Sequence, residues 1–312
     1  MTAFDIRLAV RLHRFEIVGF ALLVGLLSLA ALFVAGRLDN TGYATLCPQD
    51  GSGGRACELI AQEFWGIRQS QGAAVEGILV ALPFLLGALV GVPLVARELE
   101  RGTGRLAWSL APSRLRWLVG RLVPAAIAVF AVSLVAGLAL DRLLAASEPG
   151  MDVANAFAAF GMRGVVLAAR AVFVFAIGVA VGAVVGRSLP ALMITAVIAF
   201  VGITGGSHVH DRIIATEAVL REGDTLGTGD RFLDRRFILP DGRIATWWDI
   251  EQANRQPLDG GEWMMPDYPI VWLVVPGERY GFAQLREIGA LTGASLGFLG
   301  IAALTVRRRR PD

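Results

Sequence analysis

The sequence predicts an all-α membrane protein with six transmembrane helices and a small mixed α/β cap between the fifth and sixth. Hydrophobic residues make up 55% of its 312 residues and the mean hydropathy is +0.59, more apolar than a soluble domain of this size needs. Six windows are poor in charge and reach the length of about 20 residues at which a helix crosses a bilayer. They are Ile17–Gly36, Gly77–Ala96, Trp117–Leu140, Gly164–Gly186, Ser188–Gly206 and Ile288–Val306.

The positions of arginine predict the orientation of these spans. The chain contains no lysine, and arginines gather in the N-terminal arm, after the second window, at Arg187 and in the tail Arg307–Arg310. These four segments alternate along the chain so that they share one side, and short basic loops stay cytoplasmic. Both termini are therefore expected in the cytoplasm, and the segments 37–76 and 207–287 outside.

Residues 1–16 are expected to form an amphipathic helix in the membrane interface. Arg7, Arg11 and Arg14 fall on one helical stripe and apolar residues on another. A simple extension of the first span is the alternative. The apolar run that follows is longer than the core of a cleaved signal peptide, so we expect a retained anchor.

The outer loop 37–76 holds both cysteines of the chain, Cys47 and Cys57. A turn-rich stretch separates them, and on the oxidising side of a membrane such a pair favours a disulfide. Two free thiols or a metal pair are the alternatives. Two cysteines without a nearby histidine make a poor zinc site.

The segment 207–287 is expected to fold as an extracytoplasmic cap. "RRFILPDGRIATWW" is typical of two short strands around a Pro-Asp-Gly turn, and "YPIVWLVVPG" is a further apolar run. A packed cap without chemistry of its own and a substrate-contacting surface are both compatible with this pattern. Tryptophans and methionines could fill its core or settle at the membrane surface, namely Trp247, Trp248, Trp263, Trp272, Met264 and Met265.

Residues that could carry chemistry are few. A P-loop needs a lysine, which the chain lacks, and HExxH does not occur. His208, His210 and Asp211 are weak metal candidates, because alternate side chains share a face only in extended backbone. Arg170 lies inside the fourth window and is expected to reach the headgroups, with an anionic substrate as the alternative. Asp141, after the third window, is expected to be solvated.

A charged segment, 97–116, separates the second and third spans and is predicted to be a cytoplasmic coupling segment. Glu98 and Glu100 precede "RGTGR", where two glycines interrupt the helix, and an apolar rhythm then resumes up to Pro112. Such an elbow suits docking of another protein. The alternative is a helix that stays in the cytoplasm because of its arginines alone and docks no other protein.

The stretch "ARELERGTGRLAWSLAPSRLRWLVGRL" resembles the segment after the second membrane helix of ABC-2 type transporter permeases. The motif of that family consists of a glutamate-rich helix end, Gly-Thr, a hydrophobic stretch and Pro-x-Ser-Arg before the next span. The matching residues here are Glu98, Glu100, Gly102, Thr103, Pro112, Ser113 and Arg114, although Pro112 and Ser113 follow each other without the intervening residue of the motif. The long segment 207–287 departs from the short hairpin of many members, so the resemblance does not extend to a substrate class.

This resemblance implies a permease subunit of an ATP-driven exporter in the bacterial plasma membrane. A separate P-loop ATPase, two copies per complex, would carry ATP and Mg²⁺, while this chain would bind no cofactor and have no catalytic residue. The resemblance implies a second permease subunit, in a homodimer or heterodimer, and no nucleic-acid partner. It places the ATPase contact at Glu98, Glu100, Arg101, Gly102 and Thr103.

Apolar spans with few charges suit a hydrophobic or amphipathic substrate such as a drug, lipid or peptide. A membrane sensor whose cap binds a ligand is the alternative of a different class. An intramembrane enzyme is disfavoured, because paired acids or histidines are missing from the middle of the spans.

Overall fold

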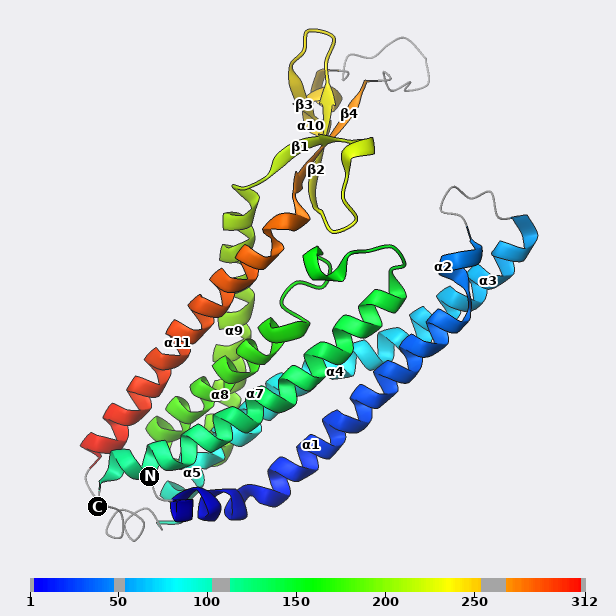
Figure 1. Ribbon diagram of the computed structural model, residues 1–312. Coiled ribbons are helices and arrows are strands. Elements are labelled where there is room, and N and C mark those ends of the chain that lie inside the picture. The colour runs from blue at the N-terminus through cyan, green and yellow to red at the C-terminus, as the bar shows by residue number, and fades with distance from the viewer. Residues whose placement is uncertain (1–2, 48–53, 103–112, 254–267, 310–312) are drawn as a thin grey trace. The chain divides into compact units, whose positions relative to one another are not determined.

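The computed structural model describes residues 3–47, 54–102, 113–253 and 268–309, with the side chains of 3–17 and 224 left aside (Figure 1). The chain divides into two compact units. The helical unit comprises residues 1–150, 159–206 and 284–312, and the sheet unit comprises 151–158 and 207–283.

The six predicted spans are confirmed as long apolar helices. Within the described residues, six helices are long and apolar enough to cross a membrane, and each overlaps one of the predicted windows over nearly its whole length. Their elements are α1 (Ala3–Asn40), α2 (Tyr43–Leu46), α3 (Gly54–Ile67), η1 (Arg68–Gly72), α4 (Ala73–Gly91), α5 (Pro93–Glu100), α7 (Arg114–Ser147), α8 (Gly164–Val185), α9 (Ser188–Ala215) and α11 (Tyr280–Arg308).

The predicted outer loop 37–76 is largely helical. Helix α1 continues to Asn40, and α3 passes through the π-helical turn η1 into α4, so that Gly54–Glu100 forms one helical run. Hydropathy missed α3 because only one face of it is apolar, with Phe64 and Ile67 buried in the core. Residues 3–16 are helical and continuous with α1, and their place in a membrane interface stays a prediction.

Helix α8 is the central helix of the helical unit and is buried almost throughout. Helices α4 and α7 lie against it, and α1 packs on α7 (Figure 1). Gly87 and Gly91 of α4 form a small-xxx-small pattern that lets the two backbones approach. A Cβ atom at Gly87 would lie 2.5 Å from the carbonyl oxygen of Ala171, and one at Gly91 would lie 2.5 Å from that of Phe175.

Helix α11 carries a similar glycine spacing in a different environment. A Cβ atom at Gly289, Gly293 or Gly297 would meet nothing within 4 Å. The same spacing therefore serves close packing in α4, while on α11 it leaves an open face.

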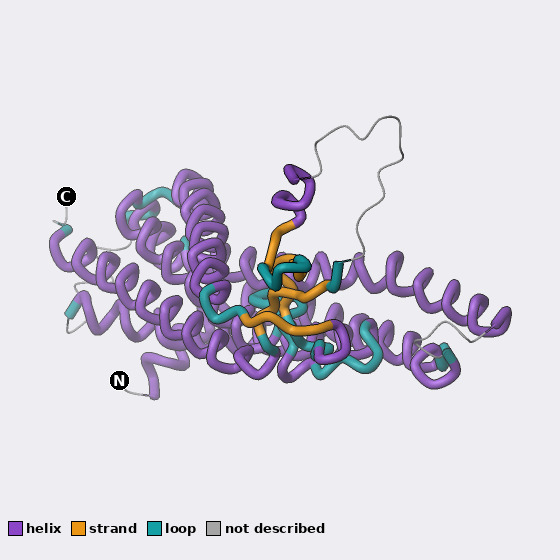
Figure 2. The backbone as a smooth tube through the Cα atoms, turned by 90° about the horizontal axis from the view of Figure 1, so that it is seen from above, coloured by secondary structure: helices purple, strands orange, loops and turns teal. Residues whose placement is uncertain are grey.

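The sheet unit contains a four-stranded antiparallel sheet in the order β1-β4-β2-β3, drawn in orange in Figure 2. The predicted hairpin around the Pro-Asp-Gly turn is present, with Phe237 of β2 opposite Ala245 of β3. The apolar run after Pro269 is the inner strand β4. The elements are η2 (Val153–Asn155), β1 (Val219–Glu222), η3 (Gly223–Thr225), β2 (Arg231–Ile238), β3 (Ile244–Thr246), α10 (Trp247–Ala253), β4 (Ile270–Val275) and η4 (Gly277–Arg279).

The small core of the sheet unit consists of Phe237, Ala245 and Ile250, with Leu239 and Tyr268 beside it. Of the tryptophans predicted either to fill this core or to settle at the membrane surface, Trp247 and Trp248 are exposed at 45% and 54%, and Trp272 is partly buried. Their exposure follows from their position at the start of the short helix α10. Trp263, Met264 and Met265 lie outside the described residues.

Two carboxylates order the loops of the sheet unit. Asp230, 3% exposed, accepts hydrogen bonds from Arg221 and from the amides of Gly227 and Gly277 at 2.9–3.0 Å. Asp249 exchanges hydrogen bonds with Thr246 at the start of α10, a reciprocal cap. The Thr246 hydroxyl, followed by the Thr246 amide, lowers the pKa of Asp249.

Candidate functional site

The helical unit has two ends with different chemistry (Figure 1). We call one the arginine end; it contains the last turns of α5, α8 and α11 and the first turn of α7. The other is the disulfide end, with the last turns of α1 and α7, helix α3 and the start of α8.

At the arginine end, Glu98 connects α5 to α7. Its carboxylate lies 2.5 Å from the guanidinium of Arg121, and both side chains are mostly buried. Arg121 also lies over the ring of Trp117, 4.7 Å from its centroid. Glu98 was predicted to be an ATPase contact, and the structure shows that it also has a partner inside the chain.

Glu100 connects α5 to the start of α9. Its carboxylate accepts hydrogen bonds from the amide and the hydroxyl of Ser188, at 3.1 and 2.7 Å. It thereby satisfies an amide in the first turn of a helix, where a negative charge is favourable. Arg101 and Gly102 follow as exposed residues, and Gly102 has a φ of +69° that suits the end of a helix. Thr103 lies outside the described residues.

The basic tail closes the carboxyl ends of two helices. Arg309 donates to the carbonyl of Ala183 near the end of α8, at 2.7 Å. Arg114 donates to the carbonyl of Arg309 at 2.5 Å. Together with the contacts of Glu98 and Glu100, these bonds link α5, α7, α8, α9 and α11 at this end.

A buried ion pair connects α8 to α11 and corrects the prediction for Arg170. The guanidinium lies 2.6 Å from the carboxylate of Glu287, and the two side chains are 7% and 9% exposed. It also packs on Gly161, where a Cβ atom would lie 2.2 Å from it. A headgroup contact was expected because the partner, 117 residues further on, cannot be seen from local sequence.

A second ion pair connects α7 to the start of α8 and corrects the prediction for Asp141. Its carboxylate lies 2.7 Å from Arg163, whose side chain is 4% exposed. Asp141 was expected in solvent because the hydropathy window ends at Leu140. Helix α7 in fact continues to Ser147. An acid at the end of one span and a base directly before the next, Asp141 and Arg163, are the signal that could have found this pair.

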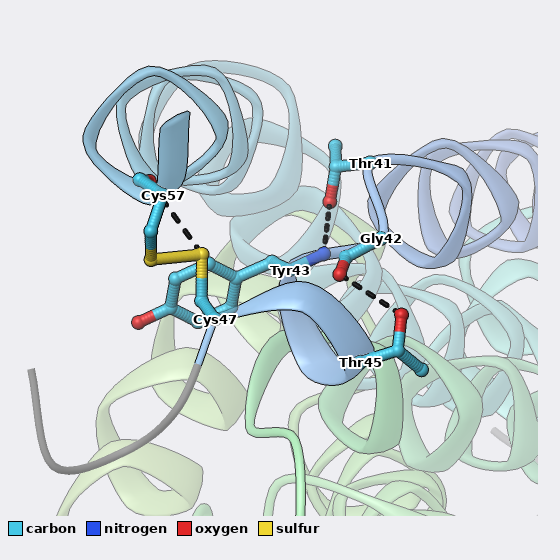
Figure 3. The surroundings of a disulfide bond; sticks show 6 residues. All are labelled: Thr41, Gly42, Tyr43, Thr45, Cys47 and Cys57. Carbon is cyan, nitrogen blue, oxygen red and sulfur yellow. Dashed lines mark hydrogen bonds between the residues drawn. A yellow bond between two sulfur atoms is a disulfide. The ribbon is translucent and has the colours of Figure 1, made fainter. Parts of the chain in front are cut away.

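The disulfide predicted between Cys47 and Cys57 is present, with Cα atoms 5.3 Å apart (Figure 3). The Cys47 sulfur also lies 3.5 Å from the carbonyl oxygen of Cys57. Nearby, the rings of Tyr43 and Phe64 stack with centroids 4.5 Å apart. The disulfide thus joins the end of α1, through α2, to the start of α3.

The weak metal candidates do not gather in the structure. His208, His210 and Asp211 lie on helix α9, where the extended backbone that would align the two histidines is replaced by a 3.6-residue period. His208 is exposed and His210 is buried, as expected for opposite helix faces. Asp211 forms an ion pair with Arg231 at 2.9 Å. Within the described residues, no group of three metal-binding side chains occurs.

Comparison with known proteins agrees with this arrangement. Residues 17–207 match the family described as ABC-2 membrane transporter related, a stretch that begins with the first span and includes most of α9. No curated protein and no solved structure matches the chain. Six apolar helices and this match identify a multi-pass membrane protein of the permease type. The chain therefore belongs to the ABC-2 membrane transporter related family.

Proposed function

We propose that this chain is the permease subunit of an ATP-driven exporter, and that a separate P-loop ATPase docks at the arginine end. The observation that carries this proposal is the set of contacts that joins α5 to α7 and α9 at that end. Exposed Arg101 and Gly102 lead from these contacts into the segment that resembles the family motif.

In this proposal the ATPase acts on α5. A partner can shift an equilibrium between two states only if its contacts differ between them. A push on the end of α5 would be transmitted to α7 through Glu98 and to α9 through Glu100, and so would tilt the spans between inward- and outward-open arrangements. ATP and Mg²⁺ remain on the ATPase.

The arginine end is cytoplasmic in this proposal, with both termini there and the sheet unit outside, in accord with the rule for basic loops. The cargo is a hydrophobic or amphipathic compound, since the spans are apolar. Export across a bacterial plasma membrane by a dimer of permease subunits follows from the family resemblance.

Replacing Arg101 with glutamate is expected to abolish co-purification of the ATPase while leaving the folded permease in the membrane. Arg101 is exposed, so the change reverses a charge at the proposed contact without opening the Glu98–Arg121 pair. Arg308→Glu is the matched control, because it reverses another exposed arginine at the same end. The measurement is recovery of a P-loop ATPase with the tagged permease, together with its ATP hydrolysis.

The double variant Glu98→Arg, Glu100→Arg is also expected to lose the ATPase and to retain insertion. It breaks internal contacts too, so Arg101→Glu is the more direct test. Equal ATPase recovery with wild-type, Arg101→Glu and the double variant would rule out docking at α5. In a separate experiment on the intact complex, the compounds that stimulate its ATP hydrolysis would identify the cargo.

A further inference from the structure

One side of the four-stranded sheet carries arginines on both flanks of a tryptophan. The strand register places Arg235 of β2 directly opposite Trp272 of β4, and Trp272 directly opposite Arg221 of β1. Residues that lie directly opposite in an antiparallel pair share a face of the sheet, with Cβ atoms about 5 Å apart. The three side chains therefore form a row across three strands of the sheet unit.

A β-bulge adds a second aromatic ring to this row. Phe232 and Arg235 are three positions apart, so in a regular strand their side chains would lie on opposite faces. The register of β2 against β4 shifts just after Phe232, and the one extra residue returns Phe232 to the face of Arg235. The rings of Phe232 and Trp272 consequently meet edge to face, with centroids 5.6 Å apart. We call the surface formed by Arg221, Phe232, Arg235 and Trp272 the aromatic face.

The aromatic face is open at its Phe232 end. Phe232 is 53% exposed, and Val219 of β1, which shares this side of the sheet, is exposed as well. Helix α10 lies against the other end of the same side, where Ile250 packs with Phe237. The open end thus presents an apolar surface on which a flat ligand can stack.

The two arginines of the aromatic face differ in how their charges are matched. Arg221 lies 2.9 Å from the carboxylate of Asp230, so its charge is balanced. Arg235 lies over the ring of Phe237, 4.9 Å from the centroid. Its guanidinium forms no ion pair with any carboxylate that the structure describes, since the adjacent Asp234 pairs with Arg236. One unmatched positive charge therefore lies beside the exposed rings.

We propose that the aromatic face binds an amphipathic organic anion, a compound with an aromatic or acyl body and a single carboxylate. The body would lie on Phe232 and Trp272, where it removes apolar surface from water. The carboxylate would accept charge-assisted hydrogen bonds from the Arg235 guanidinium. That this anion is the transported cargo rests on the proposed function, whereas its binding to the aromatic face does not.

The charge of the aromatic face favours such a compound over a larger partner. A membrane surface is bound by clusters of several basic side chains, whereas the described part of this face has one unmatched arginine. A second copy of the chain, packed on this face across a two-fold axis, would bring two unmatched arginines together. A small molecule with one carboxylate balances the charge and covers the rings.

The test uses para-benzoylbenzoate, an aromatic carboxylate that attaches to nearby C–H groups on illumination, and the full chain in phosphatidylcholine nanodiscs. Mass spectrometry locates the label, which we expect on peptides that contain Phe232 and Trp272. At a probe concentration below saturation, Arg235→Gln should lower this labelling about tenfold, because charge-assisted hydrogen bonds are lost. The uncharged para-benzoylbenzamide should label the wild type equally weakly.

Arg236→Gln is the matched control. It makes the same exchange one residue further along β2, where the side chain lies on the opposite face and pairs with Asp234. Its labelling should equal that of the wild type. Equal labelling of the wild type and both variants, or equal labelling by the two probes, would overturn the proposal. Protection from both probes in phosphatidylglycerol nanodiscs would assign the face to the membrane surface instead, and protection that grows with protein concentration would assign it to a second copy.

This labelling requires no ATPase, so its failure and the failure of ATPase docking are distinguishable. Recovery of the ATPase with Arg235→Gln should equal that with the wild type, because the substitution lies in the sheet unit. We expect para-benzoylbenzoate to stimulate ATP hydrolysis by the wild-type complex more than by the Arg235→Gln complex. Equal stimulation of the two would show that the bound anion is not the cargo.

Discussion

Replacing Glu287 with leucine is expected to destabilise the helical unit by about 3–5 kcal/mol, the range for removing one partner of a buried ion pair. Arg170 would keep its charge inside the helix bundle without the carboxylate that now lies 2.6 Å away. Thermal unfolding of the purified protein, followed by tryptophan fluorescence, measures the loss.

The double variant Arg170→Met, Glu287→Leu removes both charges but keeps the volume of the two side chains, so it distinguishes the loss of charge pairing from the loss of packing. A buried pair replaced by apolar side chains of similar volume often leaves stability unchanged, so most of the loss should be recovered. The control Asp39→Leu removes a carboxylate from the exposed Arg142 pair and should change stability by about 1 kcal/mol or less. A double variant as unstable as Glu287→Leu would contradict this account.

Replacing Gly91 with valine is expected to destabilise the protein by about 3 kcal/mol or more, at or above the upper end of the range for overpacking. The new Cβ atom would lie 2.5 Å from the carbonyl oxygen of Phe175, so α4 and α8 must separate. A backbone carbonyl cannot relieve the clash by a change of rotamer, as a side chain could. The amount of folded protein in the membrane and its unfolding temperature report the effect.

Gly293→Val provides the comparison for this variant. It makes the same exchange in the same spacing of small residues on α11, where a Cβ atom meets nothing within 4 Å. We expect its unfolding temperature to stay close to that of the wild type. If the two variants lose stability equally, the close approach of α4 to α8 is not what holds these helices together.

The sequence predicts the spans well because the bilayer requires long apolar helices, and a hydropathy window measures that property directly. It fails for α3, because a helix that is polar on one side resembles a loop in such a window. Phe64 and Ile67 lie three residues apart on the buried side of α3. The three-residue spacing of large apolar side chains in "EFWGI" was the available signal.

Charged residues near the spans were the least predictable part of the site. Arg170 was expected near headgroups and Asp141 in solvent because each was considered together with its neighbours in sequence. Their partners, Glu287 and Arg163, belong to other helices or their ends, and only the packing of α7, α8 and α11 brings them together. An arginine in an apolar helix needs a counter-charge, and the candidate acids lay just beyond the predicted span ends.

At the arginine end, the segment that the sequence resemblance selected contains residues of two kinds. Glu98 and Glu100 point to partners within the chain, Arg121 and Ser188. Arg101 and Gly102 are the exposed members of the predicted set. Resemblance identifies a motif, whereas burial separates the residues that support it from those that a partner could touch.

Helices α3 and α4, with η1 between them, run from Gly54 to Gly91 before the break at Val92, and these 38 residues measure about 57 Å at 1.5 Å per residue. A bilayer with its headgroups is about 45 Å thick, and at the average helix tilt of about 20° this run still extends about 54 Å along the normal. We therefore expect its first turns to stand in water as a stalk, paired with the end of α1 by the Cys47–Cys57 bridge. Antibodies or proteases confined to one aqueous compartment could reach such a stalk without crossing the membrane.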